Sequence, residues 1–185
     1  MLAYAFWHVP RAGVAVREYE LAHAAFHDSL RAAGVPGLLG VRVARMGGIP
    51  WLGGQAGYED WHLLDGSASL DVLNDAAISA ARRQPHDRIA ALAGEGTAGL
   101  YGLRMGRESA PAIAYWLSKP EGMGYAAFES SMEPAVAEGC ALWGRRMTLG
   151  PTPEFCLHAP AVRALPHPAQ VIALQIVSHW PGTAP

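Results

Sequence analysis

The sequence has little charge, and the charge it has is nearly balanced. Only 16% of its 185 residues are Asp, Glu, Lys or Arg, with 14 basic against 16 acidic side chains. A chain that binds nucleic acid or an anionic membrane through its overall charge is rich in basic residues, so neither partner is expected. Hydrophobic residues make up 51% of the chain, which excludes a disordered protein.

Cysteine is scarce, and long hydrophobic runs are missing. We expect Cys140 and Cys156 to be reduced core residues, because a chain this apolar does not need a disulfide. No apolar run reaches the roughly 18 residues of a membrane-spanning helix, and the opening MLAYAFWHVPR lacks the basic segment of a secretion signal. The sequence therefore predicts a cytoplasmic protein.

The motifs of several well-marked enzyme classes are also missing. The sequence contains no Walker phosphate loop, HExxH, CxxC or GxSxG. A GxGxxG does occur at 94–99, but it lies between an expected helix and an expected strand. Because a dinucleotide-binding fold needs the opposite order, we interpret this segment as a flexible connector. We expect no cofactor.

What the sequence does contain is a repeated pattern of elements. The apolar, aromatic segment 3–7 is too short for a helix and is followed by Pro10 and Gly13, which is typical of a buried strand. The segment 112–116 has the same character and is again followed by a proline and a glycine. This recurrence indicates an internal repeat.

The segments that follow each of these strands complete the same plan twice. In the first half, hydrophobic spacing and breaker residues predict a helix at 16–33, strands at 40–46 and 58–64, a helix at 70–81 with an extension through 92, and a strand at 100–105. In the second half they predict a helix at 125–138 interrupted by Pro134, and strands at 144–149, 154–158 and 171–178. A short proline-rich loop takes the place of the last helix.

The order β-α-β-β-α-β is that of a ferredoxin-like unit. Two such units in one chain resemble the dimeric α/β-barrel superfamily, which includes antibiotic-biosynthesis monooxygenases, EthD-like and stress-responsive proteins and haem-handling relatives. The resemblance covers nearly the whole chain and rests on element order rather than on a catalytic motif. It implies an α+β fold in which residues 1–107 and 110–185 each form a four-stranded sheet, and the two sheets face each other across a shared cavity.

Helix 16–33 carries three candidate metal ligands. Glu20, His23 and His27 have a spacing that places them on adjacent turns. His23 falls on the apolar stripe beside Tyr19 and Phe26, whereas Glu20 lies at its margin, so we do not expect the three side chains to converge. We interpret the histidines as buried or boundary residues and predict no metal.

Alternation along the strands gives the main candidate site. Successive side chains of a strand point to opposite faces, so polar and aromatic residues of the first and third strands share a face, with an arginine of the second strand as their neighbour. If that face looks into the barrel, it lines a ligand pocket. The candidate catalytic residues are His8, His62, Arg42 and Asp60, and the candidate ligand-binding residues are Tyr4, Phe6, Tyr58, Trp51, Tyr115 and Arg146.

The same residues also allow a purely structural interpretation. Arg42 would pair with Asp60 across neighbouring strands, and Arg146 with Glu154 would repeat that pair in the second half. The apolar loop 46–54 has three interpretations of its own: a lid over the pocket, a contact with a second copy of the chain, or a packed hairpin loop.

Three functions stay open at this point. The chain is an enzyme acting on a small apolar or aromatic molecule without a cofactor, such as a monooxygenase or isomerase, or a passive ligand-binding or structural module, or a haem-binding protein. For the enzyme, His8 or His62 is the expected general base, and Arg42 would stabilise a developing enolate or phenolate. The partners expected are a small-molecule ligand and, as an option, a second copy of the chain.

Overall fold

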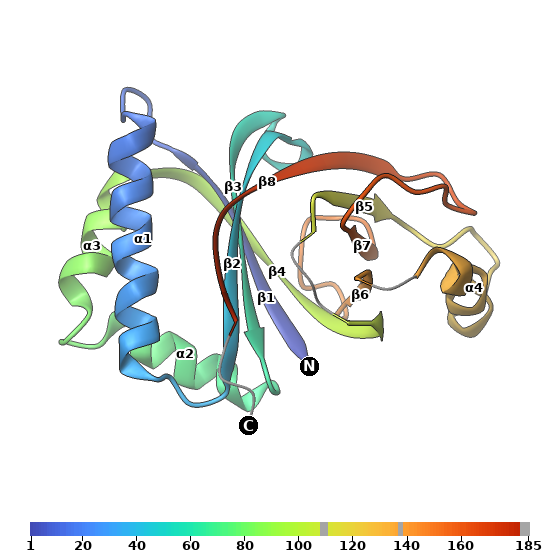
Figure 1. Cartoon of the computed structure of the whole chain (residues 1–185), viewed down its shortest axis with the longest axis horizontal. Helices are drawn as coiled ribbons and strands as arrows, with labels where there is room; N and C mark the ends of the chain where they lie inside the picture. The colour runs from blue at the N-terminus through green and yellow to red at the C-terminus, as the bar shows by residue number, and fades with distance from the viewer. Residues whose placement is uncertain (108–110, 137–138, 182–185) are drawn as a thin grey trace.

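The computed structural model describes residues 1–107, 111–136 and 139–181. These residues form one closed barrel of antiparallel strands with helices outside it (Figure 1), which confirms the α+β class. The strands follow one another around the barrel in the order β1-β3-β2-β8-β5-β7-β6-β4. They are β1 (Leu2–Pro10), β2 (Leu38–Ile49), β3 (Gln55–Leu64), β4 (Ala93–Gly106), β5 (Ile113–Leu117), β6 (Ala141–Arg145), β7 (Phe155–Ala159) and β8 (Gln170–Pro181).

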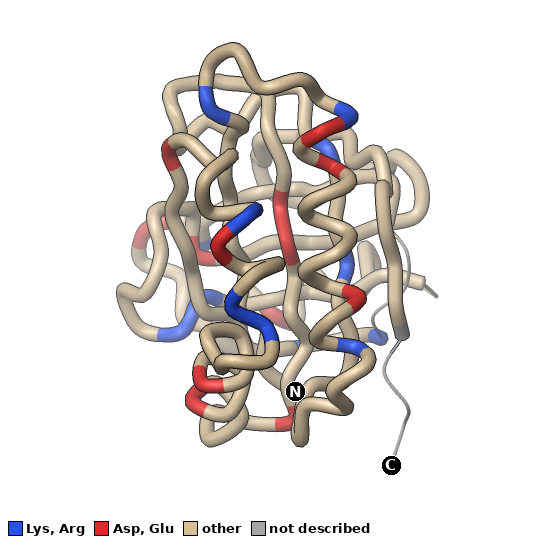
Figure 2. Tube along the Cα trace, turned by 90° about the vertical axis from the view of Figure 1, so that its left-hand side faces the viewer, with Lys and Arg blue, Asp and Glu red and all other residues tan. Residues whose placement is uncertain are grey.

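The helices are distributed unequally over the barrel. They are α1 (Val16–Ala33), α2 (Ala68–Ile78), α3 (Arg83–Leu92) and α4 (Tyr125–Met132), with short 3-10 turns η1 (Pro50–Leu52) and η2 (Glu133–Ala135). The first three lie together outside β1–β4, and α4 lies beside β5–β7 at the other end of the molecule (Figure 1). Figure 2 views the molecule from the side of the first three helices, with α1 in front of the strands. Among the described residues, no helix has the length and apolar character needed to cross a membrane.

Most helix boundaries follow the sequence signals. The prediction of a helix at 16–33 is confirmed, and it ends where Gly34 adopts a left-handed φ of 57° and donates its N–H to the Arg31 carbonyl. The predicted helix 125–138 is shorter, because α4 ends at Met132, ahead of Pro134. Residues 137 and 138 lie outside the described part of the chain.

Two predictions, one of a connector and one of a strand, are wrong. The segment 94–99 is not a connector but the start of β4, and it pairs along β1 with His8 opposite Gly96. A side chain at Gly96 would meet the Phe6 ring at 2.9 Å, so the glycine allows that ring to lie against the strand. In the second half β6 spans 141–145 rather than 144–149, and the chain turns after it through Met147, whose φ is 53°.

The strands form one continuous sheet instead of two separate ones. β2 pairs with β8 and β4 pairs with β6, and these two contacts join the strands of the first half to those of the second. Within the halves the orders are β4-β1-β3-β2 and β6-β7-β5-β8. The predicted division between 107 and 110 falls beside residues 108–110, which the structure does not describe.

The inside of the barrel is a packed core, not the shared cavity that we expected. Its largest side chains are fully buried aromatic rings that contact one another edge to face or at tilted angles: Trp7, Trp61, Trp116, Trp143 and Tyr101. Trp51 joins this cluster with ring centroids 4.9 Å from those of both Trp7 and Trp116. Such rings fill volume efficiently, so the interior has become hydrophobic core. Loop 46–54 is therefore a packed hairpin loop and not a lid.

Three ionisable groups are buried among these rings. Arg42 is 1% exposed, lies over the Trp61 ring at 5.3 Å, and places Nη2 3.2 Å from His158 Nδ1. Glu59 accepts a hydrogen bond from Trp7 Nε1 at 3.2 Å. Burial lowers the pKa of Arg42 to about 10 although Glu59 opposes that change, and burial raises the pKa of Glu59 although Arg42 opposes it. The two opposite charges therefore compensate each other inside the barrel.

His158 makes the stability of the barrel depend on pH. Burial first, and then the charge of Arg42, hold its pKa well below 6.5. Below about pH 6.5 the unfolded chain therefore binds a proton at His158 that the folded protein does not bind. The contribution of His158 to the free energy of unfolding is fully present above about pH 6.5 and is lost as the pH falls from there toward the lowered pKa. When the pH is lowered from about 7.5 to 5.0, His158 alone is expected to decrease the free energy of unfolding by about 2 kcal/mol.

The variant His158→Gln tests this expectation, because glutamine keeps a hydrogen-bonding side chain but does not titrate. Urea unfolding of both proteins at the two pH values measures the effect. On acidification, the free energy of unfolding of the variant is expected to decrease by about 2 kcal/mol less than that of the parent protein. Equal losses would show that His158 is not the group responsible.

Candidate functional site

A cavity of about 660 Å³ lies on the outer side of the sheet, beneath the first three helices. Its walls come from β1, β3, the start of β4, and α1 to α3. Most of its lining is apolar, and the polar groups are concentrated on the sheet and on α1. The lining residues are Tyr4, Phe6, His8, Tyr19, His23, Phe26, Leu30, Asp60, His62, Leu70, Asp71, Leu73, Asn74, Ala77, Ile78, His86, Ile89, Ala90, Ala93 and Gly94. This combination is typical of a small-molecule site.

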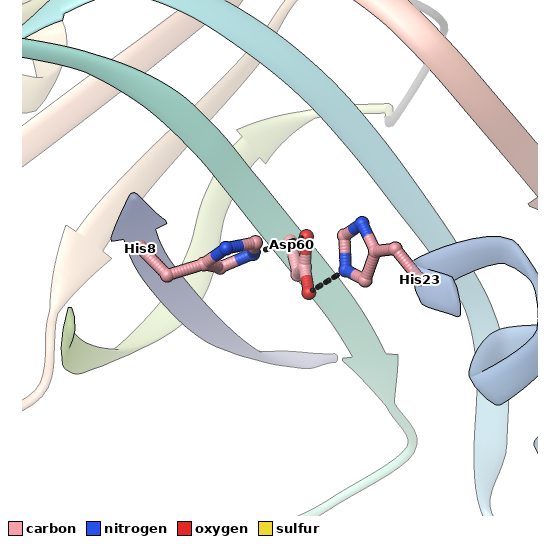
Figure 3. Close-up of side chains that lie close together, drawn as sticks. All are labelled: His8, His23 and Asp60. Atoms are coloured by element: carbon pink, nitrogen blue, oxygen red, sulfur yellow. Dashed lines mark hydrogen bonds and ion pairs between the residues drawn. The ribbon is translucent and has the colours of Figure 1, made fainter. Parts of the chain in front are cut away.

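A buried carboxylate between two histidines forms the polar wall of the cavity. Asp60 of β3 lies between His8 of β1 and His23 of α1 (Figure 3). Its Oδ2 is 2.7 Å from His23 Nε2, and its Oδ1 is 3.3 Å from His8 Nε2. All three residues are at most 4% exposed. The sheet and the helix thus contribute to one polar cluster.

Two further buried histidines lie beside this group. His27 Nε2, one helical turn beyond His23, is 3.7 Å from Asp60 Oδ2, which is outside hydrogen-bonding distance. The rings of His27 and His62 have centroids 5.3 Å apart. Within the described residues neither nitrogen of His27 has a hydrogen-bond partner, and neither has Nδ1 of His62. Buried polar atoms without partners cost about 1–3 kcal/mol each, so these nitrogens need an explanation.

The pKa values of the cluster are changed in ways that favour a charged carboxylate and neutral histidines. Burial tends to raise the pKa of Asp60, but the facing His23 and His8 outweigh burial and hold it well below its ordinary value. Burial lowers the pKa of His62 and, further, that of His27, although the charge of Asp60 opposes both changes. At neutral pH the cluster therefore contains an ionised carboxylate beside two neutral imidazoles.

A second layer fixes the orientation of the His8 ring. Tyr19 forms a hydrogen bond to His8 Nδ1, on the side away from Asp60. Phe6 and Tyr58 stack on His8, with centroids 5.1 and 5.7 Å from its own. The Tyr58 hydroxyl in turn donates to Glu20 at 3.0 Å. His8 therefore has little rotational freedom.

The prediction from strand alternation is largely confirmed for β1 and β3. Phe6 is directly opposite Asp60 and Tyr4 is opposite His62, and all four side chains line the cavity together with His8. The face that they share looks toward the helices, however, and not into the barrel. Tyr58 belongs to the same face but lies behind His8 and does not line the cavity.

Arg42 was assigned to the wrong face. It is opposite Trp61, and its neighbour Val43 is opposite Asp60, so Arg42 points into the barrel while Asp60 points away from it. The proposed Arg42–Asp60 pair and the role of Arg42 in this site are therefore wrong. Trp51 is also part of the barrel interior.

The expected ligand-binding residues of the second half lie elsewhere. Tyr115 belongs to the core between β5 and α4, where its hydroxyl bonds the backbone of Arg163. Arg146 follows the end of β6 and packs over Gly102 of β4. It lines a separate pocket with Glu154, but no ion pair joins the two residues in the part of the chain that the structure describes. The predicted repeat of a buried Arg-carboxylate pair is wrong.

The sequence interpretation also missed the contribution of α1. It expected Glu20, His23 and His27 not to converge, and Glu20 does turn away toward Arg45 and Tyr58. His23 and His27 nevertheless converge on Asp60, a residue of a different element. The available signal was the position of His23 on the apolar stripe, one turn before His27.

Comparison with known proteins supports the fold. No protein-family profile matches the sequence, and no curated protein does. Among solved structures, a candidate monooxygenase from Fusobacterium nucleatum subsp. nucleatum is 13% identical with a TM-score of 0.64, and the match covers 98% of this chain and 94% of that one. A candidate chlorite dismutase is 12% identical with a TM-score of 0.54, and the match covers 95% of each chain.

These neighbours define a class of fold and no more. The chain shares the overall fold of these two structures, a closed barrel of strands with helices outside it. At 12–13% identity the likeness does not carry an activity from either neighbour to this chain. Function has to be argued from the cavity itself.

Proposed function

We propose that the cavity binds a small, neutral, mostly apolar or aromatic molecule, and that the protein is an enzyme that removes a proton from it. No Lys or Arg is among the described residues that line the cavity, and Asp60 places a negative charge in the wall. An anionic substrate would be repelled, whereas an apolar molecule would contact the leucine, isoleucine and aromatic side chains that form most of the lining. Proton removal is the step shared by cofactor-independent oxygenation and isomerisation.

His62 is the residue that we assign as the general base, and the observation that carries the proposal is its unpartnered nitrogen. His62 lines the cavity, and its Nδ1 has no hydrogen-bond partner among the described residues. A neutral imidazole carries its proton on one ring nitrogen and offers the lone pair of the other to a ligand. Nδ1 therefore has the properties that a base requires.

The first test asks whether the cavity holds a ligand. Native mass spectrometry of the purified protein, followed by screening with small neutral aromatic compounds, is expected to show a 1:1 adduct. Replacing Ala77, which lines the cavity, with Trp should abolish the adduct because the indole would occupy the same space.

Ala80→Trp is the matched control, since Ala80 is exposed and is not among the lining residues. Thermal unfolding of both variants would confirm that each still folds. If the parent protein binds nothing, or if Ala77→Trp binds as well as Ala80→Trp, the proposal of a ligand in this cavity is wrong.

Haem is a second candidate ligand, and the same nitrogen favours it. Haem ligation needs a histidine nitrogen that no other group holds, and among the buried lining histidines His8 and His23 place Nε2 against Asp60. Nδ1 of His62 has no hydrogen-bond partner among the described residues, so it is the nitrogen that we assign to haem. Titration with hemin would show a shifted Soret band that His62→Gln abolishes if haem is the ligand.

We also propose that the barrel consists of two ferredoxin-like units, 1–107 and 110–185. Each half places its third strand in sequence between its first and second, and its fourth beside its first, so the two orders repeat one plan. The cavity then belongs to the first unit alone. The second unit closes the barrel.

A further inference from the structure

We propose that His8, His23, His27 and Asp60 form a binding site for a divalent transition-metal ion. This inference goes beyond the proposed function and does not depend on it, since metal binding can be measured without a substrate. It revises the expectation from the sequence, which predicted neither a metal nor a cofactor. The spacing of the donor atoms, the buried His27 nitrogens without partners, and the groups that support the ligands all favour a metal ion.

Three of the donor atoms already have the spacing of a metal site, and His27 lies beside them. One ligand atom from each of His8, His23 and Asp60 lies within 4.8 Å of the others. The individual separations from the Asp60 oxygens are 2.7 Å to His23, 3.3 Å to His8 and 3.7 Å to His27. A tetrahedral ion with metal-ligand distances of about 2.0–2.1 Å separates its ligand atoms by about 3.3 Å. His27 is not among the residues whose ligand atoms all lie within 4.8 Å of one another, so its side chain has to move toward His8 and His23 to become the fourth ligand.

His27 supplies the independent observation that points to a ligand. It is 6% exposed, neither of its ring nitrogens has a hydrogen-bond partner among the described residues, and it does not line the cavity. A substrate in the cavity would therefore leave it unsatisfied. A metal ion held between His27 and Asp60 would accept the Nε2 lone pair and explain why a polar ring is buried there.

The surroundings of His8 are those of a metal ligand. A histidine that binds metal through one nitrogen usually donates the other N–H to an oxygen acceptor, which fixes the tautomer. Tyr19 holds His8 Nδ1, so Nε2, which faces Asp60, is the nitrogen available to an ion. His23 and His27 are four residues apart on α1, a spacing that presents two imidazoles on adjacent turns of one helix face. Strand and helix thus fix the ligands.

The donor set indicates which ions fit. Three imidazoles and one carboxylate suit zinc, iron, nickel or copper, whereas magnesium and calcium prefer sites made only of oxygen. Because His8, His23 and Asp60 line the cavity, an ion can enter from it and a bound molecule can reach the ion. The ion would also supply positive charge beside His62, the role that the sequence interpretation had assigned to Arg42.

The experiment is a metal titration of the full chain after treatment with a chelator. Calorimetry with Zn²⁺ and absorption spectroscopy with Co²⁺ at about pH 7.5 are expected to show saturable binding of one equivalent, and Mg²⁺ is expected not to compete. Visible bands of Co²⁺ would report nitrogen and oxygen ligands directly. Zn²⁺ should also raise the thermal unfolding midpoint in proportion to its affinity.

Two ligand variants, one variant of a supporting residue and two control variants make the assignment specific. His23→Gln and His27→Leu should weaken Zn²⁺ binding more than the roughly 10- to 100-fold typical of losing a supporting group, and Tyr19→Phe should fall within that range. His167→Gln, at a histidine that bonds Ser131 in the second half, should bind like the parent protein. His62→Gln should also bind Zn²⁺ like the parent protein, because it removes the proposed base but none of the proposed ligands.

His27→Leu also tests the alternative that His27 is only a poorly satisfied core residue. Both interpretations predict that the metal-free variant folds and melts no lower than the parent protein, because leucine needs no hydrogen-bond partner. Only the metal site predicts that the variant loses the Zn²⁺-induced rise in the unfolding midpoint. If the parent protein binds no stoichiometric Zn²⁺ or Co²⁺, or if His27→Leu and His167→Gln bind equally, the metal site is wrong, whatever the cavity binds.

Discussion

Replacing Arg42 with Met is expected to lower the free energy of unfolding by about 3 to 5 kcal/mol, the usual cost of leaving a buried charge uncompensated. Glu59 is fully buried inside the barrel, and the positive charge of Arg42 compensates its negative charge. Methionine fills part of the volume of the arginine stem and avoids a large cavity. Urea unfolding monitored by tryptophan fluorescence would measure the change, because several tryptophans surround the site.

A second substitution separates lost charge from lost packing. Glu59→Gln removes the negative charge while its side-chain oxygen can still accept the hydrogen bond from Trp7. The double variant Arg42→Met/Glu59→Gln is therefore expected to recover about half or more of the stability lost in Arg42→Met. Arg31→Met is the surface control, since Arg31 is exposed and its pair with Asp28 contributes at most about 1 kcal/mol. A double variant as unstable as Arg42→Met would mean that packing, not charge, dominates.

Arg42 also shows where sequence reasoning reached its limit in the fold. Alternation along a strand is a local property, so it correctly grouped Tyr4 with His8 and Asp60 with His62. Which side of a neighbouring strand faces the same way depends on the register between strands. The register between β2 and β3 shifts at both ends of β2, between Leu38 and Gly40 and between Met46 and Ile49. A shift of one residue exchanges the faces, and nothing local in the sequence specifies it.

The direction of the shared face was not predictable for a related reason. Both faces of β1 carry aromatic residues, with Tyr4 and Phe6 on one and Trp7 on the other. Hydrophobicity therefore does not say which face lies inside the barrel and which lies under the helices. The deciding factor is the size of the interior, which in the described part of the chain is filled by four fully buried tryptophans and the Trp51 ring packed against them.

The histidines of α1 illustrate a third limit. Their spacing was visible, but a ligand set within one helix was the only arrangement that the sequence could test. The actual partner of His23 and His27 is Asp60, 37 residues from His23 along the chain, and that contact exists only when α1 packs on β3. Metal ligands brought together by tertiary structure leave no local spacing for a motif to detect.

His62→Gln is expected to reduce turnover by about 10²- to 10⁴-fold, the usual contribution of a positioned general base. Glutamine keeps much of the volume and the hydrogen-bonding capacity of the imidazole, so ligand binding should change little while proton removal is lost. The measurement does not need a known product. A molecule that binds in the cavity is incubated with the protein in D₂O, and mass spectrometry follows the exchange of its acidic hydrogen for deuterium.

The matched control is His167→Gln, a histidine on the other half of the molecule that bonds Ser131 and should leave exchange unchanged. His8→Gln probes the neighbouring position, where both ring nitrogens already have partners. A histidine with both nitrogens engaged cannot accept a proton without breaking a bond, so His8→Gln should slow exchange less than His62→Gln does. If neither His62→Gln nor His8→Gln slows the exchange, neither of the strand histidines that line the cavity acts as the base. The cavity is then a binding site only, and the passive carrier replaces the enzyme.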